Sequence, residues 1–375
     1  MKIALLMQSA ANGGVQRVMI NLAHGMIEHG AEIDFLIADA TGEMMDAIPK
    51  ECSIYDFHRR RYHGDLKVLL SMPSIIKYMK KHKDSVYIAA PGLACTVFAF
   101  LKIFFRNRKV MLINDNKCSL LLNGRMYHKI VYYVNKALYP LADRVIAAHS
   151  PALDDIVKNY SIKSSNARMI YHPLIDINAV KAQQPEREHP YISSRKEGEK
   201  ILLAVGRLVP EKDFEHLIDA VEILNQGAGV KLIILGDGPE RERLENRIKE
   251  KGLCECIDLY GYTDRVYSFM KSADLYVLSS TQEAFGNVLI EAMACGLPCV
   301  ATDCDSGGPR AIMEQSGCGK YGVLCAKDDA NALADAIRTA LDTKFDKDDL
   351  ANKSKQFEMG YSAGKYLDTA KGIGS

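Results

Sequence analysis

The sequence predicts an α/β fold made of two doubly wound parallel sheets, each covered by helices. Three observations support this fold class. With 375 residues, the chain is longer than one ordinary hydrophobic core accommodates. Short apolar strands alternate with amphipathic helical patterns along the chain, as in parallel sheets with helical crossovers. The alternation stops once, in a polar stretch at residues 176–199 that contains Pro185 and Pro190, and then restarts.

The first half begins with an apolar strand at residues 3–7. A turn containing Gly13 and Gly14 leads from it into a helix that has one apolar face and ends at Gly30. Further strands are expected at residues 33–37, 86–89, 110–113, 144–147 and 169–171.

The second half repeats this pattern, starting with a strand at residues 201–205. A helix at 213–224, a strand at 230–235 and a charged helix at 239–251 follow. The remaining elements are expected as strands at 257–260, 275–278, 299–302 and 323–325, and as a helix at 331–341.

These patterns give the domain organisation. We expect an N-terminal domain at residues 1–175, a linker at 176–199, a C-terminal domain at 200–345 and a helical tail at 346–375 that packs back on the N-terminal domain. Doubly wound sheets bind ligands outside the carboxyl ends of their strands. The two domains are therefore expected to face each other across a ligand-binding cleft.

Composition predicts a cytoplasmic protein without a spanning helix, a disulfide framework or a structural metal. The longest uncharged run, residues 86–101, is interrupted by Pro91 and is shorter than the ~20 residues of a membrane span. The start of the chain resembles a buried strand more than a signal peptide. Ten cysteines are scattered without the second pair that a zinc site needs, which fits reduced thiols.

The net charge of +1 hides an asymmetry between the two halves. Residues 1–180 hold 23 of the 48 Lys and Arg but only 15 of the 47 Asp and Glu. The excess is concentrated at residues 59–61, 77–83 and 104–109. Such clusters are commonly solvated faces. A basic, partly aromatic half also suits contact with an anionic membrane or a phosphate-bearing acceptor.

Two cations follow the strand at residues 201–205. Arg207 and Lys212 flank a short loop, so both heads could reach one point above the strand ends. A guanidinium fork and an ammonium group at one place suit a diphosphate.

Two carboxylates surround the start of the helix expected at residues 286–294. Glu283 lies in the preceding loop, and Glu291 lies about two turns inside the helix. At ~1.5 Å per residue they would be roughly 12 Å apart along the helix axis. This spacing suits two contacts on one elongated ligand better than an acid and base acting on one atom. The alternative is one loop Glu and one Glu on a polar helix face.

Other motifs allow weaker hypotheses. The glycines at 13–14 could admit an anion to a helix N-terminus, but neither they nor the turn at 236–238 form a dinucleotide fingerprint. Asp303 and Asp305 could be a paired carboxylate for a divalent metal. His149 and His172 lie at predicted strand ends and could face the cleft.

The order and spacing of these motifs resemble the retaining GT-B glycosyltransferases of family four. The resemblance covers most of the chain and is strongest in the second domain. It is carried by Val205-Gly-Arg207 with Lys212, and by the segments 235–239, 259–261, 283–298 and 300–303. It implies two Rossmann-like domains.

The resemblance also implies roles for individual residues. Arg207 and Lys212 would neutralise the donor diphosphate, and Glu291 would bind the ribose. Glu283 and the backbone of Phe285, Gly286, Asn287 and Val288 would hold the sugar and β-phosphate. The backbone of Gly261 and Tyr262 would bind the base, and Gly14 would face the phosphate and acceptor.

The sequence departs from the family pattern at three places. Ala284 stands where Gly is common. The segment 112–116 lacks the histidine that many relatives carry near the donor sugar, and we expect Asn116 or Asp115 to take its place. His172 stands where Asn often precedes the following proline.

We therefore predict a metal-independent, retaining hexosyl- or N-acetylhexosaminyltransferase without a cofactor. The donor is expected to be a nucleotide-diphosphate sugar, with UDP favoured over GDP. The acceptor is expected to be a saccharide or a polyprenyl-diphosphate-linked saccharide of bacterial envelope polysaccharide or lipopolysaccharide synthesis, at the inner face of the cell membrane, with no nucleic-acid partner. The alternatives are a sugar-nucleotide epimerase, a nicotinamide oxidoreductase and a non-catalytic nucleotide-sugar-binding module.

Overall fold

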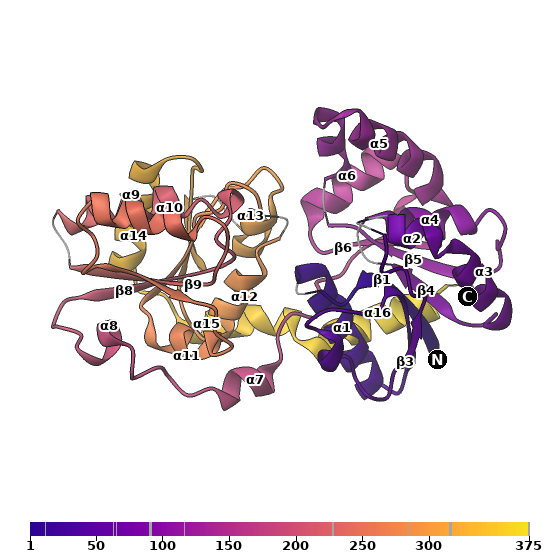
Figure 1. The fold of residues 1–375 in the computed structure, drawn as a ribbon, viewed down its shortest axis with the longest axis horizontal. Coiled ribbons are helices and arrows are strands. Elements are labelled where there is room, and N and C mark those ends of the chain that lie inside the picture. Colours follow the sequence, from indigo (N-terminus) through magenta and orange to yellow (C-terminus); the bar gives the residue numbers. More distant parts are fainter. Residues whose placement is uncertain are drawn as a thin grey trace. The chain divides into compact units, whose positions relative to one another are not determined.

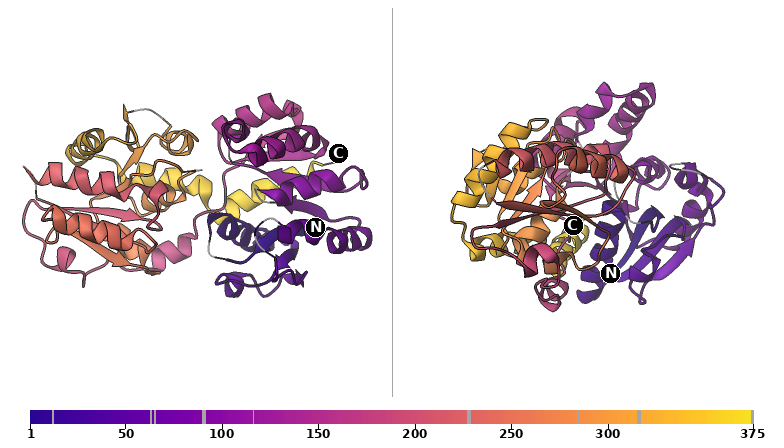
Figure 2. Two further views of the ribbon diagram at one scale, coloured as in Figure 1. Left: turned by 45° about the horizontal axis from the view of Figure 1, so that its top comes forward. Right: turned by 60° about the vertical axis from the view of Figure 1, so that its left-hand side comes forward.

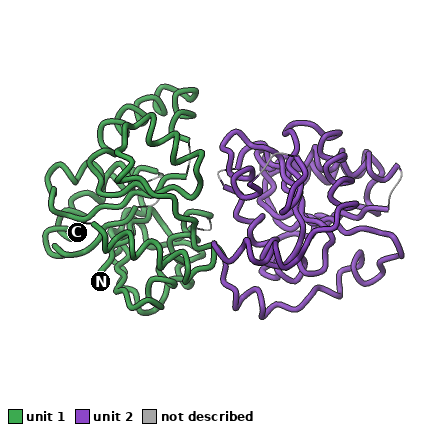
Figure 3. Tube along the Cα trace, turned by 180° about the vertical axis from the view of Figure 1, so that it is seen from behind, with its two compact units in different colours: residues 1–174, 357–375 green, residues 175–356 purple. Residues whose placement is uncertain are grey.

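The protein divides into two compact units (Figure 3). Unit 1 contains residues 1–174 and 357–375, and unit 2 contains residues 175–356. The computed structural model describes residues 1–11, 13–62, 64, 66–89, 92–115, 117–226, 229–283, 285–314 and 317–373. Each unit is built on one sheet covered by helices (Figure 1).

The sheet of unit 1 has the strand order β3-β2-β1-β4-β5-β6-β7 among the described residues, and all its strands pair in parallel. The strands are β1 (Lys2–Ser9), β2 (Glu32–Asp39), β3 (Ser53–Asp56), β4 (Val86–Ala89), β5 (Lys109–Ile113), β6 (Arg144–Ala147) and β7 (Ala167–Met169). The order reverses between β1 and β4, which makes the sheet doubly wound.

Helices cover both faces of this sheet. They are α1 (Gly14–Glu28), α2 (Leu66–Leu70), α3 (Met72–Lys81), α4 (Leu93–Leu101), α5 (Met126–Leu138), α6 (Ser150–Tyr160) and α16 (Met359–Lys371), with the 3-10 helices η1 (Met45–Ala47), η2 (Cys118–Asn123), η3 (Tyr139–Leu141) and η4 (Ser164–Asn166). Alternate strand residues enter two separate cores, because successive side chains point to opposite faces. Leu6 of β1 packs in the core with α4 and α6, whereas Leu5 packs in the core with α1 and α16.

The C-terminal helix α16 belongs to unit 1 and contacts α1 (Figure 2). A Cβ atom on Gly25 of α1 would lie 2.5 Å from the carbonyl oxygen of Met359. Only glycine permits this approach of the two helices. On the other side of the contact, Tyr366 and Ala370 of α16 are fully buried.

Unit 2 repeats the doubly wound plan, with strand order β10-β9-β8-β11-β12-β14-β13 among the described residues. Its strands are β8 (Lys200–Val205), β9 (Val230–Leu235), β10 (Ile257–Gly261), β11 (Leu275–Leu278), β12 (Cys299–Thr302), β13 (Gly317–Cys318) and β14 (Gly322–Cys325). The short edge strand β13 pairs antiparallel with β14, and the other pairs are parallel.

The helices of unit 2 surround this sheet (Figure 1). They are α7 (Ile177–Ala182), α8 (Pro190–Ser193), α9 (Phe214–Asn225), α10 (Arg241–Glu250), α11 (Val266–Ser272), α12 (Asn287–Ala294), α13 (Gly308–Met313), α14 (Ala330–Asp342) and α15 (Lys347–Ser354), with the 3-10 helix η5 (Pro210–Lys212). The 3-10 helix η6 (Lys355–Phe357) carries the chain from unit 2 back into unit 1.

The predicted fold class is confirmed, with differences in detail. The edge strands β3 and β13 were not predicted, and β7 begins two residues before the expected strand at 169–171. Residues 176–199, expected as a linker, belong to unit 2, where Lys271 donates a 2.6 Å hydrogen bond to the Val180 carbonyl. Residues 346–356 of the expected tail also belong to unit 2. Within the described residues, no helix combines the length and the hydropathy of a membrane span.

Candidate active site

The turns after β8 and β9 lie against each other in unit 2. Leu208 donates its backbone N–H to the Asp237 carbonyl at 2.9 Å, and Glu240 donates to the Leu208 carbonyl at 3.1 Å. Gly236 has φ +140°, and a Cβ there would lie 1.9 Å from the Gly206 carbonyl oxygen. The glycine at 236 is therefore required for the two turns to meet at the carboxyl end of the sheet.

Lys212 forms an ion pair with Glu283 at this edge. Both side chains are about one-fifth exposed, at 21% and 19%. The segments that carry them are tied together, because Thr281 donates its N–H to the Glu211 carbonyl at 3.0 Å and Ser279 donates its hydroxyl to the Lys212 carbonyl at 2.8 Å. Two of the predicted site residues are thus brought into direct contact.

Arg207 lies on the same loop as Lys212, and its residue is exposed. In the part of the chain that the structure describes, its guanidinium makes no hydrogen bond or ion pair with another side chain or carbonyl. The loop therefore presents one cation that is engaged by a carboxylate and one that is open to a ligand.

Helix α12 begins at Asn287, four residues after Glu283. Its N-cap, Gly286, has φ +102° and no side chain to accept from the first-turn N–H groups. The first turn of an α-helix leaves N–H groups without intrahelical partners and carries partial positive charge. Asn287 and Val288 begin this turn, and Phe285 is buried next to it. Ser306 fixes the entry to the helix by donating its hydroxyl to the Glu283 carbonyl.

Glu291 lies on the inner side of α12 and is only 7% exposed. The polar-face alternative for this carboxylate is therefore wrong. Tyr276 of β11 is fully buried in the same region, and burial together with the charges of Glu283 and Glu291 raises the pKa of its hydroxyl well above the usual value. The Tyr276 hydroxyl is therefore neutral, and it is buried without a hydrogen-bond partner among the described residues.

Gly261 and Tyr262 lie at the end of β10. The Gly261 carbonyl accepts a 2.8 Å hydrogen bond from Gly236, which joins the β10 end to the turns described above. Gly261 has φ +99° with open space where a side chain would project, and Tyr262 is exposed. Backbone at this position is accessible to a planar ligand group.

The carboxylates considered for a metal do not converge. Asp303 is held by Arg310, whose Nε lies 3.1 Å from Oδ1, and Asp305 is held by Lys327 at 2.8 Å. Among the described residues, no group of three or more His, Cys, Asp and Glu side chains is placed to hold a metal ion.

In unit 1, Gly14 is the first residue of α1. The N-cap, Gly13, has extended backbone and offers no side-chain acceptor, so the N-terminus of this fifteen-residue helix is uncapped. Asn116, the residue expected near the donor sugar, lies outside the described residues, as does Ala284.

A buried polar network follows β5 in unit 1. Asp115 Oδ2 lies 2.6 Å from His172 Nε2, and His172 Nδ1 lies 3.1 Å from the Tyr366 hydroxyl of α16. Asp115 Oδ1 also accepts the Ala148 N–H at 2.9 Å. Burial opposes ionisation of Asp115, but the charge and hydrogen bond of His172 outweigh it and lower the pKa of the carboxyl.

His149 belongs to the same network and caps α6. Its Nδ1 accepts the Ala152 N–H at 3.2 Å, and its Nε2 lies 3.0 Å from the Asp115 carbonyl. The cap requires Nδ1 without a proton, so Nε2 carries the hydrogen and donates to that carbonyl. Burial lowers the pKa of His149, in agreement with a neutral ring.

The residues that sequence reasoning missed are those with long-range roles. Tyr366 reaches His172 across 194 positions, and no local pattern marks it. Tyr276 resembles any apolar strand residue, and Ser306 any loop serine. His149 and His172 could be named as strand-end residues, but their partners could not.

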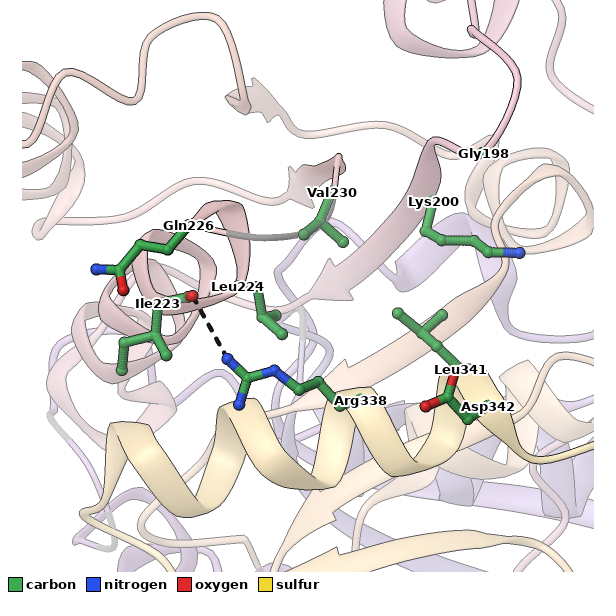
Figure 4. A pocket seen from close by; sticks show the side chains of 9 residues that line it. All are labelled: Gly198, Lys200, Ile223, Leu224, Gln226, Val230, Arg338, Leu341 and Asp342. Carbon is green, nitrogen blue, oxygen red and sulfur yellow. Dashed lines mark hydrogen bonds between the residues drawn. The ribbon is translucent and has the colours of Figure 1, made fainter.

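A hollow of about 570 Å³ lies elsewhere in unit 2 (Figure 4). It is lined by Gly198, Lys200, Ile223, Leu224, Gln226, Val230, Arg338, Leu341 and Asp342. Lys200 and Val230 begin β8 and β9, so the hollow lies at the amino ends of the strands. Doubly wound sheets bind ligands at the opposite edge. The candidate site is therefore the carboxyl edge.

Comparison with known proteins identifies glycosyltransferase families in both halves of the chain. Residues 12–175 match the family described as Glycosyltransferase Family 4, and residues 186–357 match the family described as Glycosyl transferases group 1. The two matches cover both units. Together with the doubly wound units, they define a GT-B glycosyltransferase.

Three similar proteins illustrate the relationship. The chain is 27% identical over 366 residues, with 94% of each chain covered, to N-acetylgalactosamine-N,N'-diacetylbacillosaminyl-diphospho-undecaprenol 4-alpha-N-acetylgalactosaminyltransferase of Campylobacter jejuni subsp. jejuni serotype O:2. It is 27% identical to the lipopolysaccharide core biosynthesis glycosyltransferase LpsE of Rhizobium meliloti, covering 87% of this chain and 85% of LpsE. The crystal structure of Anabaena Alr3699/HepE in complex with UDP shares the fold with a TM-score of 0.76 at 21% identity, covering 99% and 100% of the two chains. This chain belongs to glycosyltransferase family four.

Proposed function

We propose that the protein transfers a hexose or N-acetylhexosamine from a UDP-sugar to a saccharide or a polyprenyl-diphosphate-linked saccharide, with retention of configuration. The observation that carries this proposal is the Lys212–Glu283 ion pair beside the uncapped N-terminus of α12. A cation, a helix N-terminus and a second free cation at Arg207 suit a diphosphate.

Glu283 and Glu291 bind different parts of the donor, the sugar and the ribose. When the donor binds, Lys212 exchanges Glu283 for a phosphate oxygen, and Glu283 becomes free to accept from sugar hydroxyls. Glu291 accepts from the ribose hydroxyls. The backbone at Gly261 and Tyr262 binds the base.

The remaining contacts surround the β-phosphate and the donor sugar. The backbone N–H groups at Phe285, Gly286, Asn287 and Val288 hold the β-phosphate and sugar at the helix N-terminus. In unit 1, we assign Gly14 to the phosphate and acceptor, whereas Asn116, expected near the sugar, lies outside the described residues.

Transfer proceeds on the face that the leaving diphosphate vacates. The acceptor oxygen bonds to the anomeric carbon while the bond from that carbon to the phosphate oxygen breaks. The acceptor proton passes to the departing phosphate oxygen, and UDP leaves. Arg207 and Lys212 stabilise the charge that develops on the diphosphate, so the reaction needs neither a metal nor a cofactor. A covalent sugar adduct trapped on Glu283 or Asp115 would contradict this route.

The acceptor and the place of action are inferred from relatives and from charge. The name of the Campylobacter relative includes diphospho-undecaprenol. The name of the Rhizobium relative includes lipopolysaccharide core biosynthesis. The excess of Lys and Arg over Asp and Glu in residues 1–180 suits a phosphate-bearing acceptor and an anionic bilayer. We therefore place the protein in bacterial surface-glycan synthesis, at the inner face of the cell membrane.

A thermal-shift panel of nucleotide sugars tests the donor. A true donor at 100 times its dissociation constant stabilises the fold by about 2.7 kcal/mol. UDP-sugars should raise the melting temperature of unit 2, and Arg207→Gln should reduce the shift. Product analysis with a lipid-linked acceptor separates transfer from epimerisation, which needs no acceptor, and from binding alone. Stabilisation by a nicotinamide cofactor with no effect of any nucleotide sugar would contradict the proposal.

A further inference from the structure

Helix α5 of unit 1 presents five large apolar residues outward. At about 100° per residue, these exposed side chains fall within an arc of about 120°. The exposed members of this arc are Met126 (72%), Tyr127 (55%), Ile130 (55%), Tyr133 (63%) and Val134 (40%). An apolar arc of this width ordinarily faces a protein core.

The inward face of α5 combines apolar and polar groups, since Tyr132 belongs to a hydrophobic core and Leu138 packs against it. Its buried residues are Tyr132 and Asn135. Asn135 accepts a 2.7 Å hydrogen bond from the Thr96 hydroxyl, and the Tyr132 hydroxyl lies 3.4 Å from the Asn159 amide oxygen. Contacts to α4 and α6 complete this side of the helix (Figure 1). Helix α5 therefore carries apolar side chains on its outward face in addition to those that it packs inward.

The charged residues around this face of α5 are all positive. No Asp or Glu occurs between Asp115 and Asp143. Within α5, Lys129 and Lys136 lie together along one edge of the apolar arc, since they are seven residues apart. Arg125 precedes the helix and is exposed. A helix with an apolar face, aromatic residues and flanking cations is typical of helices that lie in a membrane interface.

We propose that this outward face of α5, residues 126–137, docks the protein on an anionic bilayer. The apolar side chains enter the boundary between headgroups and acyl chains, the two tyrosines lie at headgroup level, and Lys129 and Lys136 contact anionic headgroups. The inference deepens the membrane contact of the proposed function and rests on it, and it assigns that contact to a defined surface.

A bilayer fits this face better than a second copy of the chain. In a symmetric dimer the same face meets itself, so Lys129 and Lys136 would approach the same cations of the partner without a carboxylate from this segment. The basic cluster at residues 59–61 is a weaker membrane candidate, because Arg60 already lies 3.6 Å from Asp39 and 3.5 Å from Asp56.

A tryptophan reporter tests the docking directly. The chain contains no tryptophan, so Tyr133→Trp provides a single emission signal. We expect a blue shift of this emission with vesicles of phosphatidylglycerol and phosphatidylcholine, and a smaller one with phosphatidylcholine alone. Tyr361→Trp on α16 is the matched control, because Tyr361 lies in unit 1 and is 55% exposed, against 63% for Tyr133, and its emission should not shift. Equal shifts at both positions would overturn the assignment to α5.

Vesicle flotation of the full chain gives the second readout. The combined Met126→Ser, Ile130→Ser and Tyr133→Ser variant should bind the anionic vesicles about tenfold more weakly or worse. Lys129→Gln and Lys136→Gln should each weaken binding about fivefold at low salt. All five positions are exposed, so an unchanged urea midpoint is expected and shows that the fold is intact.

Three outcomes would overturn the proposal. The native chain could fail to float with anionic vesicles, the serine variant could float as well as the native chain, or the serine changes could abolish a dimer in a chain that ignores vesicles. Flotation requires no donor sugar. Absence of glycosyl transfer with normal flotation would therefore contradict the proposed function and leave the α5 surface in place.

Discussion

The two units place polar side chains at their strand ends in different ways. Unit 2 builds its candidate site from two short segments, residues 206–212 and 279–291, each of which directly follows a strand. Unit 1 joins Asp115, His172 and Tyr366, which come from three distant parts of the chain. The first arrangement is local in sequence, and the second depends on the complete fold of its unit.

The difference extends to the state of the charges. Lys212 and Glu283 are partly exposed, and the one further side-chain hydrogen bond to Glu283 among the described residues is a long one of 3.5 Å from the Ser280 hydroxyl, so a ligand can separate the pair. Asp115 is buried and already accepts hydrogen bonds from His172 and Ala148. Unit 2 is therefore suited to exchange partners with a ligand, whereas this part of unit 1 is suited to hold its shape.

The largest expected effect is the loss of transfer in Lys212→Met. The change removes a cation that faces the developing diphosphate charge, and the loss of one such stabilising group typically lowers kcat by about 10² to 10³. The free energy of unfolding should change little, because the ion pair is partly exposed. Steady-state kinetics with the donor found in the thermal-shift panel would measure both kcat and KM.

Lys251→Met provides the matched control for this experiment. Lys251 is also in unit 2 and pairs with Asp219 at 3.2 Å and with Glu222 at 2.6 Å, at a similar exposure of 23%. Its loss should leave kcat near the native value. Equal losses of activity in the two variants would show that any broken ion pair in unit 2 has this effect.

The next largest effect is on the stability of unit 1, through the hydrogen bonds of Asp115. Asp115→Ala removes the acceptor shared by His172 and Ala148, and should lower the free energy of unfolding by about 2 to 3 kcal/mol. Tyr366→Phe, which removes only one hydrogen bond of the same network, should cost about 1 kcal/mol. Urea unfolding followed by circular dichroism measures both. An Asp115→Ala variant as stable as the native chain would show that the network does not hold unit 1 together.

Two histidines in the described part of unit 1, His149 and His82, have a pKa lowered by burial, and the pH dependence assigned to His149 is the part that its replacement removes. The pKa of His149 is lowered in the folded state, so the unfolded chain takes up a proton at higher pH than the folded one. The stabilisation is present above the ordinary His pKa of about 6.5 and is lost as the pH falls below it, by at most about 1.4 kcal/mol per pH unit. His149→Asn retains an acceptor for the α6 cap and should flatten this slope between pH 6.5 and about 5.

The pH series also separates His149 from Asp115. The lowered pKa of Asp115 implies a stabilisation that is present above its ordinary value of about 3.9 and is lost at lower pH. The two losses begin at different pH values, about 6.5 for His149 and about 3.9 for Asp115. An unchanged slope between pH 6.5 and 5 in His149→Asn would contradict the role assigned to the imidazole.

The fold could be predicted from the sequence because its signals are local. The strands at residues 201–205 and 275–278 are short apolar runs bounded by polar turns, and both are present as β8 and β11. The edge strands β3 and β13 were missed for the same reason. Two of the four residues of β3 are exposed and the strand lacks an apolar run, and β13 has only two residues.

The candidate site could be predicted only where the residues share a loop or a turn. The spacing of Arg207, Lys212 and Glu283 around two strand ends made a common location predictable. The burial of Glu291 could not be predicted, because one turn of helix decides whether a carboxylate points inward or outward. The Lys212–Glu283 ion pair and the Tyr366–His172 contact could not be predicted either, because they depend on the positions of side chains in the finished fold.

The smallest expected effect concerns the carboxylates once considered for a metal. Asp303 is held by Arg310, which is exposed, and such pairs contribute about 0 to 1 kcal/mol. Asp303→Asn should therefore change the free energy of unfolding by less than about 1 kcal/mol. If unit 2 neutralises the diphosphate with Arg207 and Lys212, transfer by this variant should stay near the native rate, with or without a chelator. A strong loss of activity that added Mg²⁺ or Mn²⁺ reverses would show that a metal-binding carboxylate, and not only these cations, serves the donor.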